Sequence, residues 1–230
     1  MNARMTAHRT SCPGTNAMTV LACALLALPA VAFAQAADRP PEAVDIREWD
    51  VPWEDTRPRD PYVANDGHVW FVGQRGHYVA MLDPESGDFE RYELELGTGP
   101  HNLIVDDDGM IWYAGNLARH IGMLDPETGE ITRIPMPDED AHDPHTLVFD
   151  SRGDIWFTVQ HGNFVGKLSR ADHKVTLKRV PTPDARPYGI KIDADDVPWV
   201  VELGTNKLLR VDPDTFELSE IELPDEGSRP

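Results

Sequence analysis

Two histidines, His101 and His145, each follow a proline directly. Imidazole titrates near neutral pH, so each can act as a general base, a general acid or a metal ligand. His142 and Asp143 precede the second histidine and add another imidazole and a carboxylate. A single histidine of this kind is expected to hydrogen-bond loop backbone, but two in matching positions of neighbouring segments favour function. We therefore predict His145 and His101 as catalytic residues.

Other polar residues occupy related positions. Tyr188 follows a third proline, Asn102 follows His101, and Gln160 lies just beyond a tryptophan strand. These three residues are predicted to contact a small-molecule substrate. Carboxylates bind hard cations such as Mg²⁺, so Asp143 and Glu202 are the candidate metal ligands.

These residues belong to a sequence repeat. Four tryptophans recur at intervals of 42, 44 and 43 residues: Trp70, Trp112, Trp156 and Trp199. A proline stands 12 residues before each of them: Pro58, Pro100, Pro144 and Pro187. Such self-similarity at a fixed period is typical of repeat architectures, in which each unit is one supersecondary element.

Each unit contains four short apolar segments separated by turn residues. An Asp/Gly turn precedes the tryptophan strand, and an Asp-Pro-x-Ser/Thr turn precedes the last strand in three of the units. This pattern predicts an all-β propeller with four four-stranded blades. A β-sandwich also has short strands at this spacing, but it does not explain a tryptophan and a proline in phase in every unit. The predicted parts are a signal peptide (1–37) and the propeller (38–230), with a strand at 45–52 that closes the last blade and repeats at 57–98, 99–141, 142–184 and 185–227.

The strand order explains why the candidate residues should meet. Neighbouring strands in a blade are antiparallel, so alternate connections lie at the same end of the sheet. The residue after each proline and the residues just beyond each tryptophan are therefore expected at one face, near the central channel. The tryptophans themselves are expected in the core. The remaining histidines fall in expected turns or loops and are predicted to be solvated: His68, His77, His120, His161 and His173.

The net charge of the chain excludes some classes of binding partner. The chain has 21 Lys and Arg against 40 Asp and Glu, a formal net charge of −19. Phosphate backbones and anionic membrane surfaces both require clustered basic residues, so we expect neither a nucleic acid nor a membrane as partner. We expect a monomer that acts on a small molecule.

The N-terminus has the pattern of a secretory signal. Arg4 and Arg9 precede an uncharged run that ends at a small-x-small cleavage pattern, Ala32-Phe33-Ala34. Translation could start at Met1 or at Met18. Both cysteines lie in this segment, so the mature chain is predicted to have no thiol and no disulfide. We expect a periplasmic or secreted protein.

The repeat motifs resemble those of the virginiamycin B lyase (streptogramin B lyase) family over residues 45 to 230. The matching motifs are Gly99-Pro100-His101, Ile111-Trp112-Tyr113, Ile121-Gly122-Met123-Leu124-Asp125, Asp143-Pro144-His145 and Ile155-Trp156-Phe157-Thr158. The resemblance implies a seven-bladed propeller, so the chain is expected to be a C-terminally truncated part of one. It also implies Mg²⁺-dependent elimination in cyclic depsipeptide antibiotics, with His101 and His145 as the catalytic histidines and Asp143 as the acid.

One position departs from this family pattern. The family places a further glutamate just beyond the tryptophan of the second histidine's blade, where this chain has Val159 and Gln160. Either Glu202 substitutes from the next blade or the chemistry differs.

The resulting hypothesis is a metal-assisted C–O lyase that opens cyclic depsipeptides of the streptogramin B type or related esters. In it His145 is the base, His101 is a second acid/base or an orienting group, and Asp143 and Glu202 surround Mg²⁺. Two alternatives stay open: a non-enzymatic periplasmic binding module, and a gluconolactonase-like metal-dependent hydrolase.

Overall fold

The computed structural model describes residues 45–230, and the predicted signal peptide lies outside these described residues. Residues 47–230 form four antiparallel sheets of four strands each, and every sheet follows the order of the chain. The strands of the first two sheets are β1 (Pro58–Val63), β2 (Val69–Gly73), β3 (Tyr78–Leu82), β4 (Phe89–Glu93), β5 (Leu103–Val105), β6 (Ile111–Gly115), β7 (His120–Leu124) and β8 (Ile131–Pro135). Those of the last two are β9 (Pro144–Phe149), β10 (Ile155–Val159), β11 (Phe164–Leu168), β12 (Val175–Arg179), β13 (Pro187–Ile192), β14 (Pro198–Glu202), β15 (Lys207–Val211) and β16 (Leu218–Glu222).

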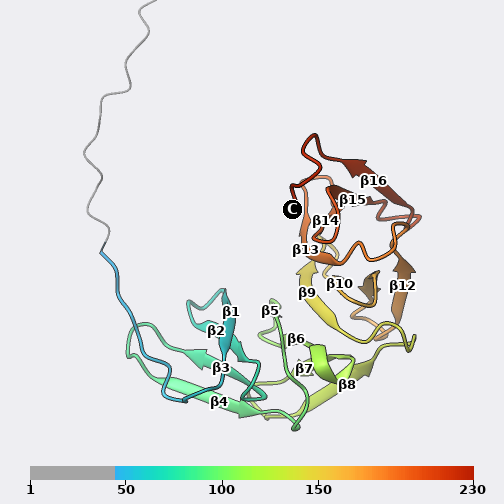
Figure 1. Cartoon of the computed structure of the whole chain (residues 1–230). Coiled ribbons are helices and arrows are strands. Elements are labelled where there is room, and N and C mark those ends of the chain that lie inside the picture. Colours follow the sequence, from blue (N-terminus) through green and yellow to red (C-terminus); the bar gives the residue numbers. More distant parts are fainter. Residues whose placement is uncertain (1–44) are drawn as a thin grey trace, which may run out of the picture. The chain divides into compact units, whose positions relative to one another are not determined.

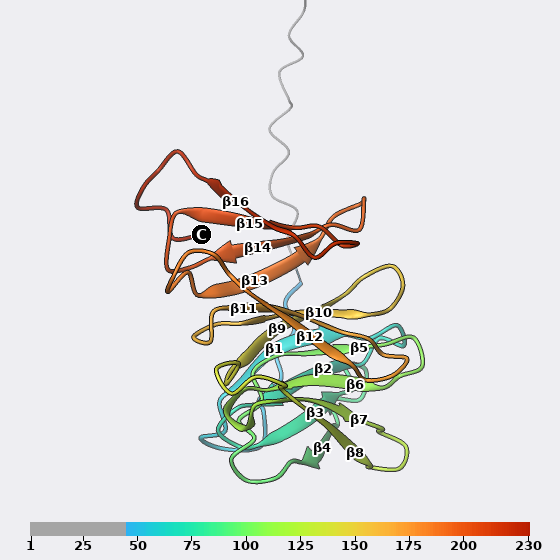
Figure 2. The same ribbon diagram turned by 90° about the vertical axis from the view of Figure 1, so that its right-hand side faces the viewer.

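The sheets pack side by side as propeller blades, which confirms the predicted fold class. The first strands β1, β5, β9 and β13 lie on the inner side of the row of sheets, and the last strands lie on the outer side (Figure 1). Figure 2 shows the β13–β16 sheet stacked on the β9–β12 sheet. Apolar clusters fill the spaces between neighbouring sheets, so each blade is stabilised mainly by burial against the next.

A β-bulge follows the proline in three of the four first strands. The pairing register shifts between Arg59 and Tyr62 in β1, between Pro187 and Ile190 in β13, and opposite Phe157 and Val159 in β9. A bulge redirects the side chains of the strand that contains it. The positions that the sequence analysis selected for chemistry therefore lie at irregular points of the inner strands.

The repeat tryptophans are tied to the turns that precede them. The indole Nε1 of Trp112, Trp156 and Trp199 donates to an aspartate six residues earlier, at 2.8, 3.1 and 2.7 Å. The same aspartates accept backbone N–H bonds inside the turn, so each closes its own hairpin. Ala64 holds this position in the first unit, and Trp70 is packed without such a bond.

The structure differs from the expectations at two places, and the predicted closure of the last blade by residues 45–52 stays a prediction. The structure assigns no strand to residues 45–52; instead Trp49 and Val51 pack against the apolar cluster around Phe71 and Tyr78 on the first sheet. Trp199 is only half-buried, unlike the other three repeat tryptophans.

His120 was expected in solvent, but it is buried on β7 against Tyr113. Its ring occupies the space that a side chain at Gly115 would fill, with ring atoms 2.5 Å from the position of a Cβ there. Burial lowers the pKa of His120, so this imidazole is a neutral packing group. No helix among residues 45–230 is long and apolar enough to cross a membrane.

Candidate active site

The two predicted catalytic histidines face each other across neighbouring blades. His145 lies on β9, and His101 lies just before β5, where its backbone N–H donates to the carbonyl of Ala114 at 2.9 Å. Their ring centroids are 3.6 Å apart and the ring planes are tilted by 40°. Both side chains are buried, with 6% of His101 and 2% of His145 exposed. The structure thus brings these two imidazoles into direct contact.

The histidine pair lies in a cavity of about 560 Å³ at the proline end of the first strands. Gln160, predicted to contact substrate, lines this cavity, together with Gln74 and Asn116. Three arginines that the sequence analysis did not select also line it: Arg57, Arg59 and Arg119. A substrate in this cavity would therefore meet imidazoles, amides and guanidinium groups.

Asp60 is a site residue that the sequence analysis missed. Its Oδ2 lies 3.4 Å from Nδ1 of His101, and its Oδ1 lies 3.4 Å from Nε of Arg59. Burial raises the pKa of Asp60, but the adjacent His101 ring and Arg59 guanidinium outweigh it and hold the pKa below its usual range. The Asp60 carboxylate is therefore positioned to orient the His101 ring.

His145 has an unusual electrostatic environment. Burial, followed by the nearby positive charges of His101 and Arg59, lowers the pKa of His145 to about 3. Its ring also packs against Tyr188 of the next blade, with centroids 4.3 Å apart, and Tyr188 itself does not line the cavity. His145 is consequently neutral at physiological pH, and its Nδ1 lies 2.9 Å from the hydroxyl of Thr146.

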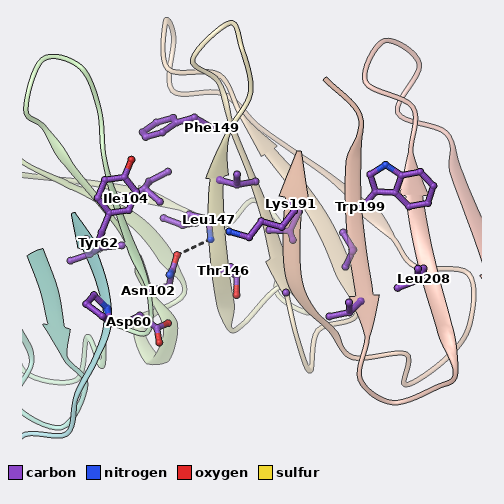
Figure 3. Close-up of a pocket in the computed structure, with 17 residues that line it drawn as sticks. Asp60, Tyr62, Asn102, Ile104, Thr146, Leu147, Phe149, Lys191, Trp199 and Leu208 are labelled. Carbon is purple, nitrogen blue, oxygen red and sulfur yellow. Dashed lines mark hydrogen bonds between the residues drawn. The ribbon is translucent and has the colours of Figure 1, made fainter. Parts of the chain in front are cut away.

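Asn102 does not line the histidine cavity. Its side-chain oxygen accepts the backbone N–H of Leu147 at 2.9 Å and thereby joins the second and third blades. Figure 3 shows this bond at a second cavity of about 670 Å³, where Tyr62, Lys191 and Trp199 also project. The observed role of Asn102 is therefore to connect blades.

The Asp143 carboxylate accepts hydrogen bonds from the turn at His161 and Gly162. Both of its oxygens accept hydrogen bonds from the backbone N–H of His161, at 3.1 and 2.8 Å. The ring Nδ1 of His161 and the backbone N–H of Gly162 donate to the same carboxylate at 2.7 and 3.0 Å. These four bonds occupy the oxygens that were expected to face a cation.

We expect Asp143→Asn to lower the free energy of unfolding by about 1–3 kcal/mol, because the amide NH₂ would face N–H donors that would lose their acceptor. Chemical denaturation checks this value. Asp138→Asn is the control, since the exposed Asp138 accepts a single backbone bond, from Asp140. If Mg²⁺ raises the melting temperature of the wild type but not of Asp143→Asn, Asp143 is a metal ligand instead.

Glu202 does not line the histidine cavity. It has no exposed surface; Thr205 donates to its Oε2 at 3.0 Å, and its Oε1 has no hydrogen-bond partner. Burial raises the pKa of Glu202 more than the Thr205 hydroxyl and the Lys207 ammonium lower it. Glu202 is thus a buried carboxyl within the fourth blade.

We expect Glu202→Gln to raise stability near pH 8 by an amount on the order of 1 kcal/mol and to change little near pH 4. The folded state holds the Glu202 proton more tightly than the unfolded state, so wild-type stability falls as pH rises above the ordinary pKa of 4.5. Thermal unfolding of both proteins across this range checks the sign, with the exposed Glu217→Gln as control. A loss of stability near pH 8 would mean that Lys207 stabilises the ionised form.

The donor set around the histidine pair does not fit a magnesium ion. Mg²⁺ favours carboxylate oxygens and water in an octahedral shell. The oxygens of Asp143 are occupied, Glu202 is elsewhere, and the position of the family's glutamate holds Val159, which is buried in an apolar cluster. Residues 45–230 contain no group of three His, Cys, Asp or Glu arranged to hold a metal ion.

Four-stranded blades with a histidine pair at the ends of two inner strands define a β-propeller with a candidate acid–base site. A model of the virginiamycin B lyase family matches residues 34–230, and the chain belongs to this family. No curated protein matches the chain.

Solved structures agree with this assignment. A selenomethionine-substituted virginiamycin B lyase from Staphylococcus aureus is 25% identical, with a TM-score of 0.74 over 80% of this chain and 61% of that one. A catalytically inactive variant of the Staphylococcus aureus enzyme with quinupristin is 25% identical, with a TM-score of 0.75 over 81% and 62%. A streptogramin B lyase structure is 31% identical, with a TM-score of 0.72 over 77% and 58%. The chain therefore spans about three fifths of the length of these lyases.

Proposed function

We propose that this protein is a C–O lyase that opens cyclic depsipeptides of the streptogramin B type, or related esters, by elimination. The observation that carries this proposal is the pair of buried imidazoles, 3.6 Å apart, in a cavity lined by polar side chains. The expected Mg²⁺ stays a prediction, and no step below is routed through it.

The two histidines can carry out different proton transfers, one as the base and the other as the acid. His145, neutral at physiological pH, accepts the proton from a carbon that is next to an amide carbonyl and adjacent to the carbon that bears the ester oxygen. The electrons of that C–H bond form the new double bond, and the C–O bond breaks with its electron pair on oxygen. His101, oriented by Asp60, is placed to protonate the departing oxygen. No water is added, so the product has the mass of the substrate.

Incubation of the full chain with quinupristin, with and without EDTA, tests this proposal by mass spectrometry. We expect ring opening without a change of mass, and its loss in His145→Gln. A gain of one water would favour a gluconolactonase-like hydrolase. Sensitivity to EDTA would mean that a metal takes its ligands from outside the described cavity residues.

A binding module is the second candidate, and the identity of residue 159 favours it. Val159 is buried among apolar side chains at the position where the resemblance implies a glutamate. Quinupristin binding without turnover would support this reading. We also propose a periplasmic or secreted monomer, which N-terminal sequencing and light scattering of the purified protein would test.

A further inference from the structure

The charge that lines the histidine cavity is opposite to that of the whole chain. The chain carries a formal charge of −19, yet three arginines and one aspartate, Asp143, line the cavity. The Asp143 carboxylate is already satisfied by the turn at His161 and Gly162. Even with Asp60 counted beside Arg59, the local charge is positive.

The three arginines are available to a ligand to different degrees. Arg59 is held in place: its Nε lies 3.4 Å from Oδ1 of Asp60, its Nη1 donates to Oε1 of Gln74 at 3.1 Å, and 20% of its side chain is exposed. Among residues 45–230, neither Arg57 nor Arg119 has a carboxylate within ion-pair distance. A guanidinium group binds a carboxylate through two parallel hydrogen bonds, so this cavity is suited to an anionic group.

An elimination needs a group that makes the C–H bond acidic. A metal ion on a carbonyl oxygen supplies this in many enzymes, but the donors around this histidine pair do not fit one. A guanidinium on a substrate carboxylate can do the same, because it neutralises the charge that builds up there when the adjacent proton leaves.

We propose that the histidine cavity takes a β-alkoxy carboxylate, whose carboxylate group is bound by Arg59 with Arg119 and Arg57 at the mouth. This inference rests on the elimination chemistry of the proposed function but assigns the cavity a different substrate, in which an ether oxygen leaves instead of an ester oxygen. His145 takes the proton from the carbon that bears the carboxylate. The C–H electrons form the double bond, the β C–O bond breaks, and the alcohol oxygen leaves with a proton from His101. An oligouronide has this arrangement at each 4-linked sugar.

Binding to the full chain is measured first, with glucuronate as the charged probe and glucose as its neutral match. Calorimetric titration should show glucuronate binding and no glucose binding. Arg59→Gln and Arg119→Gln should each weaken glucuronate binding, Arg59→Gln by about tenfold or more, and Arg59→Lys should retain part of it. Arg152→Gln is the control, because Arg152 pairs with Asp150 and Asp214 at the turn between β9 and β10. Thermal unfolding shows whether each variant is folded.

Turnover is measured second, with an oligouronide and with quinupristin, by the ultraviolet absorbance of a new double bond and by mass. Glucuronate binding that depends on Arg59, with elimination from the oligouronide, supports the inference. Equal binding of glucose and glucuronate, or full binding by folded Arg59→Gln, overturns it. Quinupristin opening that is unaffected by Arg59→Gln would overturn the inference and leave the proposed function standing. Arginine-dependent binding without any elimination would refute the proposed function while the anion site stands.

Discussion

Replacing Trp156 by alanine should lower the free energy of unfolding by about 3–5 kcal/mol, whereas Trp199→Ala should cost less than about 1 kcal/mol. The two tryptophans occupy the same position in successive repeats and make the same bond to a turn aspartate. Trp156 is fully buried between the third and fourth blades, where it packs on Phe216 with ring centroids 5.0 Å apart. Trp199 is half-buried, so its truncation leaves no enclosed cavity.

Urea denaturation followed by circular dichroism measures both values. Trp156→Phe separates packing from hydrogen bonding, because it keeps most of the apolar surface and removes the bond to the buried Asp150. Equal losses for Trp156→Ala and Trp199→Ala would show that the turn bond, and not burial between blades, is what stabilises these positions.

Replacing His145 by glutamine should reduce turnover by about 10²–10⁴-fold, the usual contribution of a general base. Single-turnover assays with the substrate identified above measure this loss. His68→Gln is a suitable control, because His68 pairs with Asp66 in an exposed turn of the first blade. If His145→Gln keeps full activity, the reaction takes place elsewhere in the protein.

The same variant has a second readout that does not depend on activity. The pKa of His145 is about 3 in the folded protein and near 6.5 in the unfolded chain. Between pH 3 and pH 6.5 the unfolded chain therefore binds more protons than the folded protein. Wild-type stability therefore falls as pH drops through this window, and His145→Gln should lose less stability over it. Activity should likewise show no acid limb from His145 between about pH 5 and pH 8.

The blade architecture could be predicted because each repeat carries local sequence signals for its strands and turns. A tryptophan, a proline and two turn signatures recur in phase, and they specify a four-stranded unit without knowledge of distant contacts. Features that depend on neighbours could not be predicted in this way. Trp199 has the same local sequence pattern as Trp156, and only the packing of the adjacent blades distinguishes their burial. The segment at 45–52 resembles the last strand of a repeat in sequence, but the structure assigns no strand to it.

The site was predictable to the extent that it follows the repeat. His101 and His145 occupy equivalent positions of adjacent repeat units. Because adjacent units form neighbouring blades, the two rings are in contact. Arg59 occupies the position that the count gives it, but the bulge that follows it in β1 places a second charged residue, Asp60, beside His101, and the repeat contains no signal for this. Asp143 and Glu202 have the residue type of metal ligands, but the sequence cannot show that backbone N–H groups already bind the first or that the second is enclosed.

The consecutive strand order in every sheet has a consequence for folding speed. Each strand pairs only with the strand before or after it in the chain, so every strand pairing joins residues of the same blade. Relative contact order is therefore low for an all-β protein, and low contact order accompanies rapid folding. Each hairpin can form before its blade docks, and docking then adds the inter-sheet apolar clusters. Stopped-flow refolding should accordingly be faster than that of Greek-key sandwiches of similar length and stability.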